Sequence, residues 1–273
     1  MKRTYIVLIV FVVLLLGFGG GYALWKYRVT VPISEKEESA PGAFKVIYDL
    51  PENQDFSALA QFLQESKIFE EIAVHFNKLL ILPFDIPIHF TECGEENAYY
   101  DTESRQIKMC YELVRSLMQT FSPYSKSDEE LDQFIVNTTF FLLYHEMGHA
   151  LVDVFEIPTT GKEEDAVDQL ATLVLLRSDD DKDEEAALDA ASWFFLQGAQ
   201  KTKIKQLAFW NEHSLDKQRF YDIACLVYGK NPQKHPELVT NDVIPGERAV
   251  RCESEYKKTA ASWNALLSPH YRQ

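Results

Sequence analysis

The stretch FIVNTTFFLLYHEMGHALV, residues 134–152, is apolar around almost its whole circumference when it is drawn as a helix. Such a helix lies in the core of a protein rather than on its surface. Ser127 lies upstream, and Glu130 follows it at the spacing of a capping box, which marks the start of a helix. Pro158 ends the pattern. The sequence therefore predicts a long buried helix over about residues 128–155.

Two histidines and a glutamate occupy the middle of this predicted helix, in the order H-E-x-x-H. His145 and His149 are four residues apart, so both side chains lie on one face and can reach one metal ion. Glu146 lies about 100° further round the helix, where its carboxylate would face a metal-bound water. Zinc lowers the pKa of such a water toward about 7, and a nearby carboxylate can accept its proton. The alternative is two core histidines bonded to carbonyl groups, but buried polar groups need partners and a metal supplies them.

A catalytic zinc ion usually has three protein ligands and a water, and the next predicted helix offers the third. In GKEEDAVDQLATL, residues 161–173, Glu164 and Asp168 are four residues apart and share one face. We interpret Glu164 as the third ligand, and Asp168 as the acceptor for the outer nitrogen of a zinc-bound histidine. Asp153, one turn beyond His149, is expected to support the site in the same way. The rival third ligands are Glu163, Asp165 and Asp153.

Hydrolysis of a peptide also needs a hydrogen-bond donor for the oxyanion that forms on the carbonyl. The segment NEHSLDKQRFYDIAC, residues 211–225, contains candidates. We take His213 and Tyr221 as catalytic candidates. Arg219 is a further donor, although it could simply pair with a buried acid.

The N-terminus has the pattern of an export signal. Lys2 and Arg3 precede an uncharged apolar run over residues 5–25, which is long enough to cross a bilayer and also matches the layout of a secretory signal. We favour an uncleaved signal-anchor over residues 1–29, because glycine-rich candidates give only weak cleavage sites. Residues 30–42 then form a linker, and residues 43–273 form one exported domain.

Four cysteines, Cys93, Cys110, Cys225 and Cys252, form no C-x-x-C pair. An even number in an exported chain suggests disulfides. Pairing the nearest neighbours would close two local loops, but the sequence leaves three pairings open, and four buried thiols are the alternative.

Composition excludes some functions. The formal net charge of −15 argues against nucleic acid as a partner and against tight docking on anionic lipid. Hydrophobic periodicity predicts strands first and helices afterwards, which is an α+β fold that is mainly helical. The expected strands cover residues 44–51 and 86–93, and residues 97–111 are expected to form two short strands around a polar turn. The expected helices cover residues 56–82 with a break near Lys67, 162–176, 184–200, 214–228 and 246–267.

The motif HEMGHALVD, followed by E-x-x-x-D, resembles the gluzincin metallopeptidases, the group that includes thermolysin. More closely, most of residues 43–265 is similar to a bacterial family of uncharacterised domains described as metallopeptidases, through ECGEENAYYD, IKMCYEL, GKEEDAVDQLA and QRFYDIACLVYG as well as the motif. The resemblance implies a zincin-like fold. Such a fold has a small N-terminal mixed sheet whose edge strand lines the cleft, an HExxH active-site helix, and a helical C-terminal half.

Together these features predict a zinc metalloendopeptidase with one Zn²⁺ per chain that hydrolyses peptide or protein substrates. We expect it at the bacterial cell envelope, membrane-anchored with its domain outside the cytoplasm, or periplasmic or secreted if the signal is cleaved. The alternative is a catalytically inactive zinc-binding envelope protein that keeps a peptidase scaffold and acts by binding. Glu146 argues against this alternative, because a structural zinc site needs no base and is closed by a fourth protein ligand.

Overall fold

A mixed sheet forms the N-terminal part of the domain. Its strands are β1 (Phe44–Tyr48), β2 (Ile86–Thr91), β3 (Ala98–Asp101) and β4 (Gln106–Cys110), in the spatial order β1-β2-β4-β3. β1, β2 and β4 are parallel to one another, and β3 is antiparallel to β4 at the edge. The buried residues of β2, Ile86, Ile88 and Phe90, alternate with partly exposed ones, so one face of the strand is fully buried, as the two-residue period requires.

The computed structural model describes residues 40–177, 181–201 and 203–273. The predicted signal-anchor over residues 1–29 lies outside these residues, as does most of the predicted linker. Residues 41–273 form one compact unit. Within the described residues, no helix combines the length and the apolar character that crossing a membrane requires.

Helices surround the sheet and make up the C-terminal half. The short turn η1 (Gln54–Phe56) leads into α2 (Ser57–Ser66), which is followed by α3 (Ile68–Leu79). The break falls at Lys67, whose φ of 58° is left-handed and ends the first helix. Next come α4 (Tyr111–Phe121) and α5 (Asp128–Val154). The remaining elements are α6 (Glu163–Leu175), α7 (Asp181–Gln200), η2 (Ile204–Gln206), α8 (Asp216–Lys230), α9 (Glu237–Thr240), α10 (Gly246–Leu267) and η3 (Ser268–His270).

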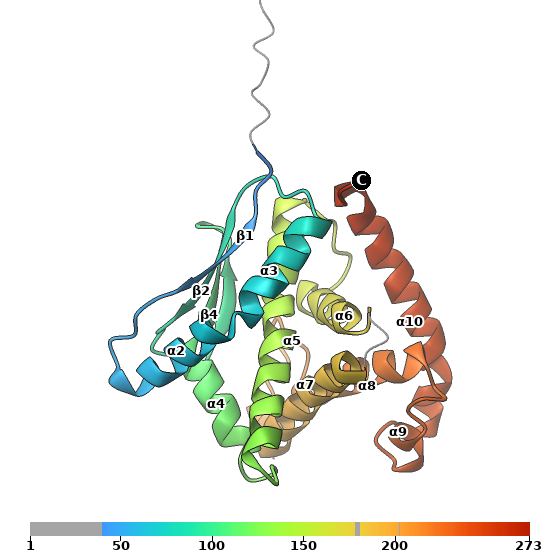
Figure 1. Cartoon of the computed structure of the whole chain (residues 1–273). Coiled ribbons are helices and arrows are strands. Elements are labelled where there is room, and N and C mark those ends of the chain that lie inside the picture. The colour runs from blue at the N-terminus through green and yellow to red at the C-terminus, as the bar shows by residue number, and fades with distance from the viewer. Residues whose placement is uncertain (1–39, 178–180, 202) are drawn as a thin grey trace, which may run out of the picture. The chain divides into compact units, whose positions relative to one another are not determined.

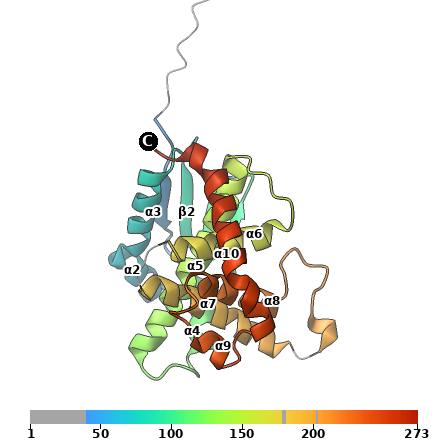
Figure 2. The same cartoon turned by 90° about the vertical axis from the view of Figure 1, so that its right-hand side faces the viewer.

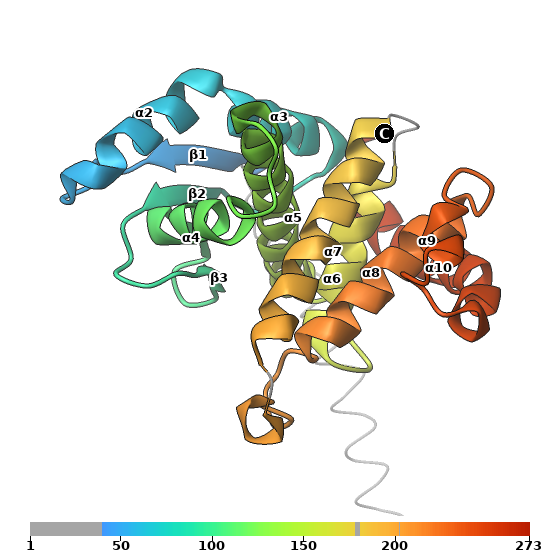
Figure 3. The same ribbon diagram turned by 90° about the horizontal axis from the view of Figure 1, so that it is seen from below.

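The long helix α5 is the centre of the domain. Figures 1 and 3 show it between the sheet on one side and α6, α7 and α8 on the other. Ser127 accepts a hydrogen bond from the backbone N–H of Glu130 at 3.2 Å, so the predicted helix start is confirmed. Thirteen residues of α5 are buried, including His145 and Glu146, and a helix that is buried on nearly all sides is what its composition predicts.

The α+β architecture, mainly helical with a small N-terminal mixed sheet, is therefore confirmed. Two details differ from expectation. Residue 111 does not extend a strand: it begins α4, whose apolar face over Leu113, Val114 and Leu117 packs into the core. The helix expected from residue 214 begins at Asp216, with Leu215 at its N-cap.

Each disulfide joins a cysteine to the next cysteine along the chain. Cys93 pairs with Cys110, which ties the loop after β2 to the end of β4. Cys225 pairs with Cys252 and links α8 to α10, which pack against each other at one side of the helical half (Figure 2). Both cysteines of this second pair are fully buried.

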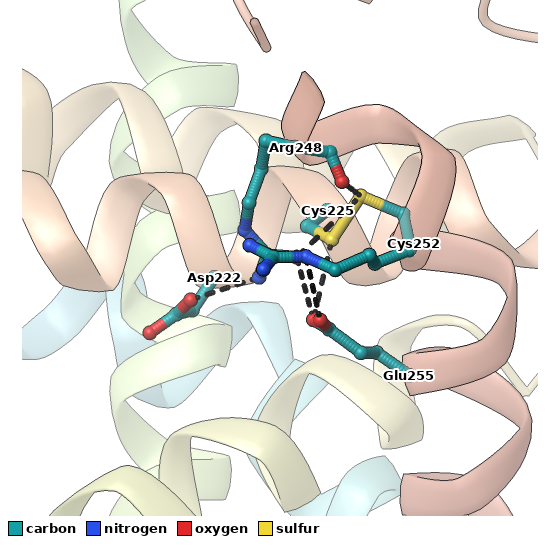
Figure 4. Close-up of a disulfide and its surroundings, with 6 residues drawn as sticks. Asp222, Cys225, Arg248, Cys252 and Glu255 are labelled. Carbon is teal, nitrogen blue, oxygen red and sulfur yellow. Dashed lines mark hydrogen bonds and ion pairs between the residues drawn. A yellow bond between two sulfur atoms is a disulfide. The ribbon is translucent and has the colours of Figure 1, made fainter. Parts of the chain in front are cut away.

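An ion cluster covers the α8–α10 disulfide (Figure 4). Arg248 of α10 donates to Asp222 of α8 at 3.1 Å and contacts Glu255, about two turns further along α10, at 2.6 Å. One guanidinium thus bridges the two helices beside the covalent link. The α8–α10 contact is held by burial, by charge and by the disulfide together.

Removing the Cys225–Cys252 bond should lower the free energy of unfolding by about 3 kcal/mol, because an open loop of this length leaves the unfolded chain more freedom. The double substitution Cys225→Ala and Cys252→Ala tests this by urea denaturation. Val250→Ala on the same helix is the matched control, since Val250 is exposed and its loss should change stability by no more than a few tenths of a kcal/mol. A double variant as stable as the parent would contradict the expectation.

Candidate metal centre

The packing of α5 on α6 depends on one glycine. A Cβ added at Gly148 would lie 2.9 Å from Cβ of Val167 and 3.0 Å from its Cγ1. Real side chains do not approach this closely, so only glycine lets α6 come so near to α5 at this level. Val167 is fully buried and lies three residues after Glu164, on the same side of α6. The glycine of the motif therefore brings the α6 carboxylates within reach of the α5 histidines.

Gly148→Ala should push α6 away and disturb the site from a distance. The new methyl group meets the branched carbon of Val167, which cannot swing aside. We expect a loss of about 1–3 kcal/mol in stability and weaker zinc binding, measured by thermal unfolding with and without zinc. The double variant Gly148→Ala with Val167→Ala should recover much of both, because it removes the clash. Unchanged zinc affinity in the single variant would contradict this account.

Three donor atoms converge where α5 faces α6. Nε2 of His145 lies 3.1 Å from Oε2 of Glu164, the two Nε2 atoms of His145 and His149 are 3.2 Å apart, and Nε2 of His149 is 3.4 Å from Oε2 of Glu164. Tetrahedral zinc with bonds of about 2.0–2.1 Å keeps its ligand atoms about 3.3 Å apart. Among the described residues these three form a group able to hold a metal ion.

The outer nitrogens of both histidines are occupied by carboxylates. Nδ1 of His145 lies 2.8 Å from Asp168, and Nδ1 of His149 lies 2.7 Å from Glu163. In its neutral form each imidazole therefore keeps its proton on Nδ1 and directs the lone pair of Nε2 inward. In that form two nitrogen lone pairs and a carboxylate oxygen meet within 3.4 Å. Acceptors so close repel one another unless a cation lies among them, so the donor set fits a metal ion.

Asp168 is itself held in place by α8. Nε and Nη2 of Arg219 donate to its two carboxylate oxygens at 2.6 and 2.7 Å, in a bidentate pair. The guanidinium carbon of Arg219 lies 3.9 Å from the ring centroid of Phe194 in α7, so the cation is fixed from a second side. Successive contacts from His145 through Asp168 and Arg219 to Phe194 link the candidate metal centre to the core of the helical half.

The electrostatics of the group match this arrangement. Burial opposes the charged form of His145, but the carboxylates of Asp168 and Glu164 outweigh it and raise the pKa to about 9. Burial would raise the pKa of Asp168, but the Arg219 cation and His145 outweigh it and lower the pKa to about 2. The pKa of Glu164 lies well below its usual range, because the three histidines around it outweigh the effect of burial. The acids thus stay ionised, and a cation at the centre of the group would replace protons there.

Glu146 is buried beside the group but is not one of the three donors. Glu146 is only 6% exposed, and this burial raises its pKa. The nearby His145 and His149 lower the pKa, but their effect is smaller. The backbone N–H of Tyr100 in β3 also faces the Glu146 carboxylate and lowers the pKa. A buried carboxylate with a raised pKa next to a metal position is suited to accept and return a proton.

The edge strand β3 lies against α5, and Figure 3 shows the sheet beside this helix. Cys110 donates its N–H to the carbonyl of Asn97, so these opposed residues form a hydrogen-bonded pair of the ladder. The alternation of an antiparallel ladder then turns the backbone groups of Ala98 and Tyr100 away from β4, toward the free edge. Because the N–H of Tyr100 faces Glu146, this free edge borders the candidate centre.

His213 lies next to the three donors, from the segment before α8. Its Nε2 is 2.9 Å from Oε2 of Glu164, and its ring is stacked 6.2 Å from that of His145. Among the described residues His213 groups with Glu164 and Glu212 rather than with both histidines of α5. It therefore does not close the centre as a fourth ligand, and its N–H can face a group bound at the centre.

A lysine holds His213 in this position. Nζ of Lys162, the residue before α6, donates to the carbonyl oxygens of Asn211 and His213, each at 3.2 Å. The side chain of Asn211 in turn accepts from the backbone N–H of His213 at 2.8 Å. The segment that carries His213 is thus fastened to the same helix that carries Glu164.

Two predicted site residues lie elsewhere. Tyr221 is two residues after Arg219 on α8, about 200° round the helix, and its ring packs on that of Phe220 at 5.0 Å. The face that carries Arg219 points to the centre, so Tyr221 points away from it. Asp153 is exposed and accepts from the hydroxyl of Tyr100 at 2.8 Å, while Glu163 takes the place beside His149.

The comparisons with known proteins agree with this geometry. No curated protein and no solved structure gives a significant match. A family model described as "Putative metallopeptidase" matches residues 48–267, which cover strands β2 to β4, both helices of the candidate centre and the helical half as far as the end of α10. The chain therefore belongs to this family.

Proposed function

We propose that the protein is a zinc-dependent endopeptidase in which His145, His149 and Glu164 hold one zinc ion and Glu146 is the general base. The observation that carries this is the convergence of two histidine Nε2 atoms and one carboxylate oxygen at tetrahedral spacing, with the Nδ1 atom of each histidine beside a carboxylate on the outside. Three protein ligands leave a fourth position for water, which is the pattern of a catalytic site.

A bound zinc ion would polarise the peptide carbonyl and lower the pKa of a water molecule at the fourth position. Glu146 would accept a proton from that water as its oxygen adds to the carbonyl carbon. The same carboxylate would then give the proton to the amide nitrogen, so that the C–N bond breaks and an amine and a carboxylate leave. The imidazole of His213, beside Glu164, would donate to the oxyanion.

The free edge of β3 suits an extended substrate. Its outward N–H and carbonyl groups can pair with a polypeptide in the manner of an added strand. A chain bound there would run past Glu146, which lies beside Tyr100 of the same edge. Because this pairing uses only the substrate's backbone, selection among its side chains would depend on other surfaces of the protein.

The location belongs to the proposal as well. The uncharged apolar run over residues 5–25 would anchor the chain in the bacterial envelope with its domain outside the cytoplasm. The two disulfides support an oxidising compartment. Protease protection of the domain in intact cells, and its loss after permeabilisation, would test the orientation.

The direct test is hydrolysis of a fluorescence-quenched peptide library by the purified full chain in detergent. We expect cleavage within peptides, its loss on treatment with a chelator, and its return with one equivalent of zinc. A zinc-loaded protein that binds peptides but cleaves none would favour the inactive scaffold that acts by binding.

Lys162→Met should slow turnover without affecting the metal. The variant loses both hydrogen bonds to the segment that carries His213, and two exposed bonds of this kind correspond to about a 3- to 10-fold fall in kcat. Zinc content should stay at one per chain, because Lys162 contacts no metal ligand's side chain. Lys162→Arg should restore much of the rate. Equal loss in the methionine and arginine variants would contradict a positioning role.

A further inference from the structure

The segment that joins α7 to α8 carries three large apolar side chains on its surface. Ile204, Phe209 and Trp210 are 79%, 66% and 87% exposed; we call these three residues the apolar lip. Leu50 and Val250 are as exposed, but Leu50 lies in the loop after β1 and Val250 lies on α10. Single exposed apolar residues are ordinary, whereas a group of them marks a surface that contacts something.

The apolar lip lies on a turn beside a pocket. Asn211 donates its N–H to the carbonyl of Ala208 at 2.9 Å, which places Phe209 and Trp210 at the tip of the turn. Figures 2 and 3 show this segment projecting beyond the adjoining ends of α7 and α8. Ala208 and Asn211, at the base of the turn, line a pocket of about 380 Å³.

A glycine shapes the other end of this pocket. A Cβ added at Gly198 near the end of α7 would lie 2.8 Å from Cγ of Lys217 and 3.3 Å from Cβ of Asp216. The glycine therefore lets the last turn of α7 approach the first turn of α8 closely. The pocket is bounded by two packed helices on one side and by the turn that carries the lip on the other.

The pocket shares walls with the candidate metal centre. His213 lines it and lies 2.9 Å from Glu164. Arg219 also lines it and holds Asp168, the partner of His145. An extended chain advances about 3.3 Å per residue. A substrate with its carbonyl at the centre can therefore place a neighbouring side chain past His213 into the pocket.

Most charges of the lining are paired. Lys201 is paired with Asp216 at 2.6 Å, and Arg219 is paired with Asp168. Lys217 also lines the pocket but is exposed to solvent. The apolar surface comes from Leu207, Ala208 and Leu215. The volume lies at the lower end of the range of about 300–1,000 Å³ for ligand pockets, which admits side chains of an extended chain and not a folded element.

We propose that this pocket and the apolar lip form a specificity subsite for a large aliphatic or aromatic residue beside the scissile bond. The substrates would be flexible polypeptides with exposed apolar residues, gripped by Phe209 and Trp210. This inference rests on the proposed peptidase function. Aromatic side chains on a turn supply much contact area at little cost in conformational entropy.

The test compares hydrolysis of matched peptides by the zinc-loaded parent and by a zinc-loaded variant without the lip. The peptides are based on library sequences that the parent cleaves, and they differ only in having leucine or serine beside the cleaved bond. Phe209→Ser with Trp210→Ser removes most of the lip, and both side chains are exposed, so the fold should stand. We expect kcat/KM on the leucine peptide to fall about 10- to 100-fold, through KM, with kcat within about twofold. Val250→Ser, which removes an exposed apolar side chain elsewhere, should behave as the parent.

Binding of the leucine and serine peptides to the zinc-loaded Glu146→Gln variant tests the subsite without turnover. If the parent cleaves nothing, but this variant prefers the leucine peptide and loses the preference with the lip, then hydrolysis fails and the subsite stands. Equal binding of both peptides, or binding unaffected by loss of the lip, overturns the subsite even if the parent is an active peptidase. Loss of co-sedimentation with phosphatidylcholine vesicles, with peptide binding unchanged, would assign the lip to lipid and also overturn it.

Discussion

Replacing Glu146 by glutamine is expected to lower kcat/KM for peptide hydrolysis by about 10²- to 10⁴-fold, the range for loss of a general acid–base group. The amide has almost the shape of the carboxylate but cannot accept a proton from water at neutral pH. The fall should appear in kcat with little change in KM, because in the proposed mechanism Glu146 would contact the reacting water and not the substrate chain.

The fold should survive this change. The carboxylate of Glu146 is buried, and burial already raises its pKa, so the charged form is unfavourable in the metal-free protein. A neutral amide removes that cost, and the thermal midpoint without metal should stay the same or rise. Zinc content should remain at one per chain, because Glu146 is outside the group of three donors.

Zinc content by mass spectrometry under native conditions and steady-state kinetics on one peptide are the two measurements. Glu71→Gln, on the exposed side of α3, is the matched control for the loss of one carboxylate. If Glu146→Gln retains activity within about fivefold of the parent, the general base must be sought elsewhere. A variant that has lost both activity and zinc would leave the carboxylate a role in metal binding instead.

The sequence was informative about the centre wherever one helix carries the geometry. His145, Glu146 and His149 stand on α5, and the positions of their side chains follow from 3.6 residues per turn. The same rule relates Glu164 to Asp168 on α6. The pairing of the two helices could be expected from their spacing.

Contacts between distant elements were less accessible. Arg219 reaches Asp168 across 51 residues, and a lone arginine on a predicted helix gives no sign of its partner. The supporting role assigned to Asp153 fails for a similar reason. One turn beyond His149 it lies on the correct face, but the chain there leaves the core, so Tyr100 of β3 meets it at the surface. Glu163 was considered only as a ligand, although its register on α6 brings it to Nδ1 of His149.

The closing segment of the site was the hardest to predict. His213 could be proposed because it precedes a helix, but Lys162, which fixes it, carries no motif. Tyr221 was proposed on residue type alone, and the register of α8 turns it away. The start of α4 at Tyr111 was hidden because strand β4 runs into the helix without a glycine or proline to mark the boundary.

Glu164→Ala is expected to abolish stoichiometric zinc binding. Structural zinc sites are worth about 10–16 kcal/mol over four ligands, or about 3–4 kcal/mol per ligand, so loss of one ligand weakens binding about 10²- to 10³-fold. The remaining histidines also lose the carboxylate oxygen that lies within 3.4 Å of both Nε2 atoms. We therefore expect one zinc per chain in the parent and little after dialysis of the variant.

A graded series on the same helix tests the assignment more sharply than one variant. Glu163→Ala and Asp168→Ala remove carboxylates from the outer nitrogens of His149 and His145, and such changes typically cost about 10- to 100-fold in metal affinity. Asp168→Ala should cost more stability as well, because it leaves Arg219 buried without its partner. Asp165→Ala is the matched control, since Asp165 is not one of the three donors.

The order of zinc affinities decides which acid is the third ligand. Parent and Asp165→Ala should bind equally, Glu163→Ala and Asp168→Ala should fall between, and Glu164→Ala should be weakest. If Glu163→Ala loses the metal while Glu164→Ala keeps it, Glu163 is the ligand and Glu164 is the acid that positions His213. If zinc binds none of these proteins, the convergence of His145, His149 and Glu164 has another cause, and the peptidase mechanism falls with it. The zinc titration should precede every search for a substrate, because every catalytic step proposed for Glu146 and His213 depends on the metal.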